Sequence, residues 1–514
     1  MNGADTLIET LIENDVTACF ANPGTSEMQF VSALDRQPAM RPVLCLFEGV
    51  ATGAADGYGR IAGKPACTLL HLGPGYGNGL ANLHNARRAF TPIVNVIGDH
   101  ATYHRRYDAP LASDIAAIAG ANSVWVKSAE GPDQVADLAA EAVGASYGPP
   151  GGSASLILPA DCAWSPAVLA ARPKAIRRGK SHPDGTAVEA VARRMKAAKK
   201  PVLVLGQGAC GEAALAAAAR LATLGVRILT DTFIGRQPRG AGRFLPDRMM
   251  YFGEQALEDL AGVDLMALVE TDPPAAFFAY PGRPSLLVPE GCETTVLASR
   301  EQDGAAAISM LAEALGAPAS GPVQPLERPA PRPGVLTPST VGAAVGRHLP
   351  EGAIVCDDGV TASQPILNAT RSAPPHDWMA LTGGAIGLGI PMSIGAAVAA
   401  PGRKVISLNG DGAAMYTPQG LWTLAREGLD VTVIIFANRN YRVLNIELGR
   451  TGAGNPGPAA AKLLSLDDPR IDWLSLAKGL GVPATRCDDA DAFETAFARA
   501  MAEPGPRLIE AALP

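Results

Sequence analysis

The sequence predicts an α/β protein of three domains, each with a mainly parallel sheet flanked by helices. Short apolar runs rich in β-branched residues alternate with alanine-rich helical runs along the whole chain. With 514 residues, the chain is too long for one small module. Glycine is frequent, at 56 residues, whereas aromatic residues make up only 5%, a balance typical of proteins with many strand-to-helix turns.

Two segments mark the expected domain boundaries. Residues 165–185 carry a local run of positive charge, and residues 316–334 hold six prolines. Both compositions are typical of linkers. We therefore expect a first domain over residues 1–165, a central domain over 185–315 and a third domain over 335–514.

The expected strands are short apolar runs that end in polar residues. In chain order they lie at residues 17–22, 43–48, 66–72, 91–99, 200–208, 226–231, 352–359, 404–412 and 430–440. In sheets whose strands run parallel, ligands bind beyond the carboxyl ends of the strands. The polar residues at these ends are therefore where chemistry is expected.

Composition restricts the classes of partner. The formal net charge is −7 and no basic stripe is visible, which argues against nucleic acid or an anionic membrane. The eight cysteines include no C-x-x-C pair, and the N-terminal residues resemble an acidic amphipathic helix rather than a signal peptide. Residues 378–402 are uncharged but rich in glycine, so we expect a buried helix there and not a membrane span. These features together predict a cytoplasmic protein.

The strongest functional pattern is a site for a cation and a diphosphate. Asp411 lies between Gly410 and Gly412 at one expected strand end, and Asn438 and Asn440 lie at the next. If the two strands are neighbours, a carboxylate and an amide oxygen meet, and Mg²⁺ takes such oxygens together with phosphate oxygens. The helix expected after Gly412, beginning near Ala413, would direct its free N–H groups at the phosphate.

This pattern, together with CFANPGTSEM and LFEGVATGAADGYGRIAG near the N-terminus, resembles thiamine diphosphate (ThDP)-dependent enzymes. The similarity runs in the order pyrimidine-binding, central and diphosphate-binding domain. It is greatest to the acetolactate synthase and benzoylformate decarboxylase group, and within it to acetolactate synthase-like large subunits. The resemblance implies ThDP and Mg²⁺ as cofactors and decarboxylation or carboligation of a small-molecule 2-oxo acid.

The resemblance also assigns roles to single residues. Glu48 would bond the pyrimidine ring of ThDP and promote loss of the thiazolium proton. It would come from one subunit and Asp411 from another, in a homodimer or a dimer of dimers. Ile386 would support the bent cofactor and Gly384 would accept from its amino group. The further positions implied to bind cofactor are Gly359, Val360 and Thr361, and the turn Asn22, Pro23, Gly24 and Thr25.

The substrate side is expected around His71, Thr25 and Phe278. Histidine suits proton transfer because its pKa lies near neutrality. Phe278 falls where the decarboxylase carries a second histidine, which argues against simple benzoylformate decarboxylation. The central domain is short for an acetolactate synthase, so FAD is possible but not expected.

Two alternatives of other classes remain open. Gly206, Gly208 and Gly211, followed by Asp231, fit a dinucleotide-binding pattern, as in a nicotinamide-dependent oxidoreductase. A ThDP-binding regulatory chain without turnover is the second alternative. His100 and His104 have a spacing that could hold a metal on a helix, but they follow a strand without a nearby third ligand, so we expect a loop.

Overall fold

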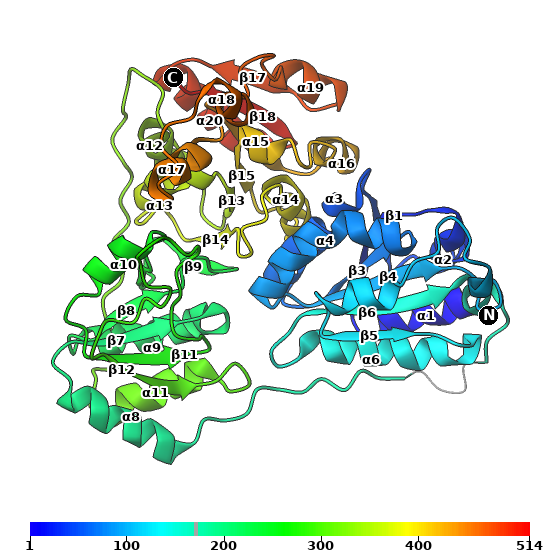
Figure 1. Ribbon diagram of the computed structural model, residues 1–514, viewed down its shortest axis with the longest axis horizontal. Helices are drawn as coiled ribbons and strands as arrows, with labels where there is room; N and C mark the ends of the chain where they lie inside the picture. The colour runs from blue at the N-terminus through cyan, green and yellow to red at the C-terminus, as the bar shows by residue number, and fades with distance from the viewer. Residues whose placement is uncertain (169–172) are drawn as a thin grey trace.

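The computed structural model describes residues 1–168 and 173–514. The linker expected over 165–185 includes residues 169–172, which lie outside the described residues. The described chain forms three sheets flanked by helices, so the predicted α/β class with mainly parallel sheets is confirmed. Figure 1 shows the three units side by side, with residues 173–184 running from the first unit to the central one.

The first sheet has six parallel strands in the order β2-β1-β3-β4-β6-β5. The strands are β1 (Ala18–Asn22), β2 (Arg41–Leu44), β3 (Ala66–Leu70), β4 (Ile93–Asp99), β5 (Trp125–Ser128) and β6 (Ser153–Pro159). The helices of this unit are α1 (Gly3–Glu13), α2 (Met28–Leu34), α3 (Glu48–Ala62), α4 (Leu72–Ala89), α5 (Ile115–Gly120), α6 (Val135–Tyr147) and α7 (Ala160–Trp164).

The second sheet has five parallel strands in the order β10-β8-β7-β11-β12. They are β7 (Pro201–Leu205), β8 (Arg227–Thr230), β10 (Asp247–Arg248), β11 (Leu265–Val269) and β12 (Glu293–Ala298). The helices are α8 (Gly185–Ala197), α9 (Glu212–Ala222), α10 (Gly253–Asp259) and α11 (Gly304–Ala314).

The third sheet has seven strands in the order β17-β18-β16-β15-β13-β14-β9. They are β9 (Gln237–Arg239), β13 (Ile354–Asp358), β14 (His376–Ala380), β15 (Val405–Gly410), β16 (Val431–Ala437), β17 (Ala484–Cys487) and β18 (Arg507–Ala512). The helices are α12 (Pro338–His348), α13 (Ser363–Ala369), α14 (Gly389–Ala399), α15 (Asp411–Ala414), α16 (Gly420–Glu427), α17 (Arg442–Arg450), α18 (Pro458–Leu464), α19 (Trp473–Gly479) and α20 (Ala490–Ala502).

One strand crosses the expected domain organisation. β9 comes from the part of the chain expected to form the central domain, yet it pairs antiparallel with β14 at the edge of the third sheet. The expected domain boundaries themselves remain a prediction.

The first and third units share a tightly packed helix crossing. A Cβ added at Gly395 of α14 would lie 1.8 Å from the carbonyl oxygen of Ala54 in α3. A Cβ at Gly57 of α3 would lie 2.1 Å from the carbonyl oxygen of Met392. Only glycine permits this backbone approach. The uncharged stretch 378–402 therefore forms β14, a loop and the buried α14, and no helix of the described residues is long and apolar enough to cross a membrane.

Candidate active site

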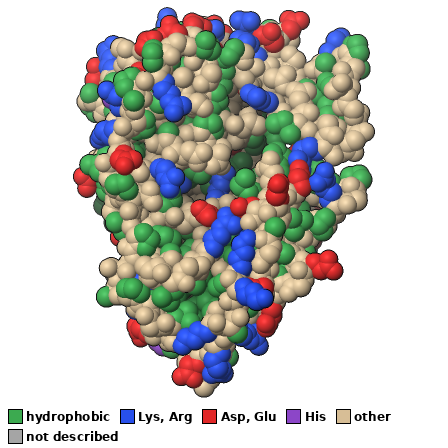
Figure 2. Space-filling view, turned by 90° about the vertical axis from the view of Figure 1, so that its left-hand side faces the viewer, with side chains coloured by type: hydrophobic (Ala, Val, Ile, Leu, Met, Phe, Trp, Pro, Cys, Tyr) green, Lys and Arg blue, Asp and Glu red, His purple; other side chains and the backbone are tan. Residues whose placement is uncertain are grey.

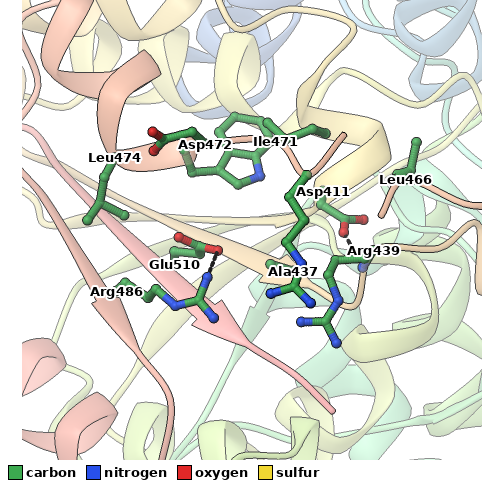
Figure 3. Close-up of a pocket in the computed structure, with 11 residues that line it drawn as sticks. Asp411, Ala437, Arg439, Leu466, Ile471, Asp472, Leu474, Arg486 and Glu510 are labelled. Carbon is green, nitrogen blue, oxygen red and sulfur yellow. Dashed lines mark hydrogen bonds and ion pairs between the residues drawn. The ribbon is translucent and has the colours of Figure 1, made fainter. Parts of the chain in front are cut away.

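The carboxyl ends of β15 and β16 bring Asp411 and the Asn438–Asn440 loop together. The two strands are parallel neighbours, with Gly410 opposite Phe436. Asp411 Oδ2 accepts a hydrogen bond from the Arg439 backbone N–H at 2.6 Å, shown as a dashed line in Figure 3. Asn438 Oδ1 accepts from the Asn440 N–H at 2.9 Å. The juxtaposition expected from the spacing is therefore present.

The donor set fits a hard cation that also binds phosphate. Asp411 is only 4% exposed, and burial raises the pKa of its carboxyl group. Its oxygens accept backbone N–H groups, so a divalent cation would supply the missing positive charge. Among the described residues no group of three or more His, Cys, Asp or Glu could hold a metal. The site therefore fits an ion with one carboxylate, amide and carbonyl oxygens, and phosphate as ligands.

Gly412 in this loop is sterically required. Gly412 lies with Ala413 in the short helix α15. A Cβ added at Gly412 would lie 2.3 Å from the ring of Tyr441. The segment after β13 is also constrained, because Val360 has φ +49 and is 40% exposed between Gly359 and Thr361. A β-branched residue in the left-handed region is rare and marks a candidate functional turn.

The loop that carries Gly384 and Ile386 is held by a buried acid that sequence reasoning missed. Asp358 Oδ2 accepts the backbone N–H groups of Gly387, Leu388 and Gly389, at 2.8, 2.9 and 3.2 Å. Asp358 is 1% exposed, and burial raises the pKa of its carboxyl group to about 7. Gly384 has φ +73, and Ile386 stays half-buried.

The other face of this loop is held from the first unit by Asn85, which is fully buried. Its amide oxygen accepts the N–H groups of Gly383 and Ala385, and its amide nitrogen donates to the Ala385 carbonyl at 2.7 Å. Asn85 also donates to Asn82, which in turn donates to the carbonyl of Gly49 at 2.8 Å. A continuous chain of hydrogen bonds therefore joins the start of α3 to the Gly384–Ile386 loop.

Glu48 begins α3 and is 6% exposed. Its Oε2 accepts a hydrogen bond from Asn78 Nδ2 at 3.0 Å, and Asn78 itself is exposed. Among the described residues, Glu48 makes no hydrogen bond or ion pair with Asp411 or the Asn438–Asn440 loop. The two predicted cofactor contacts are therefore not joined directly within one chain.

His71 lies at the end of β3 and contacts the predicted Asn22–Thr25 turn. Its Nδ1 lies 2.9 Å from Glu27 Oε2 and 3.2 Å from Ser26 Oγ. Glu27 is 3% exposed and also accepts the Gly24 N–H at 2.8 Å. Glu27 thus orients both His71 and the turn that includes Pro23. Sequence reasoning missed Glu27, although its position three residues after Gly24 matches the spacing of a capping box.

An aromatic group from the central unit covers the third unit near Gly384. Phe277 lies against Gly384, because a Cβ there would be 2.6 Å from the Phe277 ring. Phe278 is 51% exposed and packs edge-on against Phe277, with ring centroids 4.7 Å apart. Tyr280 donates to Glu447 of α17 at 2.7 Å. Phe277, and not Phe278, is thus the ring that lies against Gly384. The role of Phe278 at the substrate stays a prediction.

The dinucleotide-like turn of the central unit is filled by a side chain of the protein. A Cβ at Gly208 would lie 1.9 Å from Glu270 Oε2, and Glu270 Oε1 accepts the Gly304 N–H at the start of α11. Lys180 pairs with this carboxylate at 2.5 Å. An anion thus already lies where glycine-rich turns and helix N-termini bind phosphate. Asp231 accepts from the Thr271 hydroxyl, at 2.9 and 3.0 Å to its two oxygens.

The rings of His100 and His104 are tilted by 53° to each other, with centroids 5.3 Å apart, in a turn before Arg105. No third metal ligand joins them in the described part of the chain.

Comparison with known proteins points to one family. Residues 1–118 match the family described as "Thiamine pyrophosphate enzyme, N-terminal TPP binding domain", and residues 359–511 match its C-terminal counterpart. The chain is 50% identical to "Putative acetolactate synthase large subunit IlvX" of Mycobacterium tuberculosis, over 100% of this chain and 99% of that protein. It is 27% identical to a Pseudomonas aeruginosa benzoylformate decarboxylase, over 98% and 97% of the two chains.

Its fold is similar to that of a solved 4-hydroxybenzoylformate decarboxylase of Rhodococcus jostii RHA1. The TM-score is 0.87 at 24% identity, and the match covers 100% of this chain and 99% of that one.

Proposed function

We propose, from the premise that this chain belongs to the thiamine diphosphate-dependent enzymes, that it uses ThDP and Mg²⁺ to decarboxylate a 2-oxo acid. The product is either released as an aldehyde or ligated to a second carbonyl compound, as in acetolactate synthesis. The observation that carries the proposal is the hydrogen bond from the Arg439 backbone N–H to Asp411, which places the Asn438–Asn440 loop beside this carboxylate at two adjacent strand ends.

Asp411, Asn438 and a backbone carbonyl near Asn440 would hold Mg²⁺, with the Gly359–Thr361 and Gly410–Ala413 turns around the diphosphate. When bound, ThDP would supply a carbon nucleophile for the 2-oxo group and an electron sink for the loss of CO₂. The chain's own residues bind and orient the cofactor, exclude water and move protons.

Glu48 is proposed to hold the proton at the pyrimidine ring, because its carboxylate is nearly buried and, in the described part of the chain, only Asn78 donates to it. Since Glu48 does not contact Asp411 in the same chain, we propose that two protomers complete each site. Homodimers and dimers of dimers both satisfy this arrangement. His71, oriented by Glu27, is proposed to transfer protons on the substrate side.

The relatives support both plain decarboxylation and ligation. Glu270 in the glycine-rich turn argues against a nicotinamide-dependent oxidoreductase and against FAD, because its carboxylate stands where a nucleotide diphosphate would bind. The intact Glu48 and Asp411 argue against a regulatory chain without turnover. A cytoplasmic location is proposed as well, supported by eight cysteines that form no disulfide.

A panel of 2-oxo acids tests the proposal, with each acid supplied with and without an acceptor aldehyde or a second 2-oxo acid. Products are read by mass spectrometry in the presence of ThDP and Mg²⁺. We expect CO₂ release from at least one acid, and none when either cofactor is left out. Release that is indifferent to both cofactors would contradict the proposal.

A further inference from the structure

A pocket of about 210 Å³ lies against Asp411. It is covered by the start of α19 and bounded by the carboxyl ends of β16, β17 and β18 (Figure 3). Asp411 borders it, but Gly359–Thr361 and the Gly384–Ile386 loop do not. The pocket is therefore a separate space that touches the cation loop.

Three arginines line this pocket: Arg439, Arg470 and Arg486. The Arg470 Nε donates to Asp467 at 2.8 Å, and no hydrogen bond joins its two terminal nitrogens to the described residues. Arg439 has one weak bond, from Nη2 to the Leu513 carbonyl at 3.3 Å, and an ion pair with Asp467 at 3.5 Å. A guanidinium carries five N–H donors, so most donors of these two residues remain available.

A buried donor lines the same space. Trp473 is 1% exposed, and its indole Nε1–H has no hydrogen-bond partner among the described residues. An indole nitrogen can only donate, and a buried donor without an acceptor is costly, so such groups in native proteins mark a missing partner. The missing partner here is a hydrogen-bond acceptor.

The backbone of Arg439 gives an independent indication. Arg439 has φ +57, a left-handed conformation that favours glycine or asparagine. A long charged side chain at such a position is unfavourable unless the side chain contributes something that glycine lacks. Strained residues of this kind cluster at ligand sites.

The acids near the pocket leave most N–H donors of Arg439 and Arg470 without a partner. Asp472 caps α19 by accepting the Ser475 N–H at 3.0 Å, and its carboxylate points away from Arg439 (Figure 3). Arg486 is held by two acids, Glu510 at 3.0 Å and Asp488 at 2.9 Å. Asp411 accepts two backbone N–H groups. Among the described residues, Asp467 is the one ion-pair partner of both Arg439 and Arg470.

We propose that this pocket binds a tetrahedral oxyanion, either inorganic phosphate or the phosphate group of a phosphomonoester. Arg439, Arg470 and Arg486 would bind its oxygens through charge-assisted hydrogen bonds, and the Trp473 N–H would donate to a further oxygen. Arg439 lies within the Asn438–Asn440 loop and its backbone N–H bonds Asp411, so the anion would bind on the proposed cation loop itself. The site is a second one, used in addition to that of the cofactor diphosphate.

Calorimetric titration tests the site on protein saturated with ThDP and Mg²⁺ in phosphate-free buffer. The probes are inorganic phosphate, glycerol 3-phosphate and acetate as a planar control. We expect both phosphates to bind and acetate to bind at least about tenfold more weakly. The tighter of the two phosphates identifies the source of the ligand.

Variants assign the binding to the pocket. Arg470→Gln removes an arginine whose side chain is 59% exposed, and it should weaken phosphate binding about fivefold or more. Trp473→Phe should also weaken phosphate binding, because it removes the indole N–H donor while keeping an aromatic ring in the same place. Arg36→Gln makes the same charge change at a side chain 49% exposed in the first unit, and should leave binding unchanged. Absence of phosphate binding, equal affinity in Arg470→Gln and Arg36→Gln, or competition between phosphate and ThDP would each overturn the proposal.

Discussion

The strand ends of the second and third sheets begin from similar sequences and differ in what they hold. In both, a glycine-rich turn follows a buried parallel strand and leads into a helix, with an aspartate nearby. In the second sheet the turn is filled by Glu270, whose charge is balanced by Lys180. In the third sheet the buried Asp411 has backbone donors only, beside an asparagine loop. The comparison teaches that a glycine pattern predicts an anion site but not its occupant.

The largest effect is expected for Glu48, the residue of the first unit that is proposed to act on the cofactor bound at the third sheet. Glu48→Gln keeps the size of the side chain but removes the charge that holds the proton. We expect ThDP still to bind, while exchange of its thiazolium proton slows by about 100- to 10,000-fold. Exchange is followed by NMR in deuterated buffer, and an unchanged rate would remove Glu48 from its proposed role.

The next effect distinguishes the strand ends of the second sheet from those of the third. Asp411→Ala should weaken retention of ThDP with Mg²⁺ by about 100-fold, because a carboxylate ligand is lost. Asp231→Ala is the matched change at the second sheet and should leave this affinity within about twofold, because Asp231 bonds Thr271. Equilibrium dialysis measures both. Similar affinities in the two variants would contradict the proposal that the cofactor binds at the strand ends of the third sheet and not at those of the second.

A third change tests the internal ion pair of the second sheet. Glu270→Gln leaves Lys180 without its partner, so we expect a loss of about 1–3 kcal/mol in the free energy of unfolding. Glu212→Gln breaks an exposed pair with Arg243 in the same unit and should cost less than about 0.5 kcal/mol. Urea unfolding gives both values. A cost for Glu270→Gln no larger than that for Glu212→Gln would mean that the carboxylate is not needed in the turn.

The smallest effect is a pH dependence at the second sheet. Burial raises the pKa of Asp231 to about 6, above the value of about 3.9 in an unfolded chain. The folded state therefore binds the proton more tightly, so this contribution to stability is full below pH 4 and lost as the pH rises through 6. Asp231→Asn removes the titration. The stability of this variant relative to the unsubstituted protein should therefore rise by about 1–2 kcal/mol between pH 4 and 7. We expect no more than this because the Asp231 carboxylate retains some solvent contact, which reduces the effect of burial. A constant difference across this range would contradict the burial argument.

Local pattern was enough to predict the elements that present the residues proposed to bind the cofactor. The strand expected at 404–412 is β15, and that at 430–440 contains β16, so Asp411 and Asn438 follow from alternation and spacing. The residues missed are those whose roles depend on distant partners. Asn85 bonds a loop about 300 positions away, Asp358 bonds Gly387–Gly389, and Glu270 fills the turn at Gly208.

The antiparallel edge strand β9 was missed for the same reason. Its three residues pair with β14 in another part of the chain, and no periodicity can develop over so short a segment. Tertiary partners of this kind leave no signal in a single sequence, whereas strand ends with glycine and a polar residue do.

The most direct measurement is co-expression of Glu48→Gln with Asp411→Ala, each inactive alone. If each site takes Glu48 from one protomer and Asp411 from its partner, mixed dimers contain one intact site, and activity should return to about a quarter of the unsubstituted level. Activity that stays at the level of the single variants, although mixed dimers form, would show that both residues act within one chain or that they do not share a site.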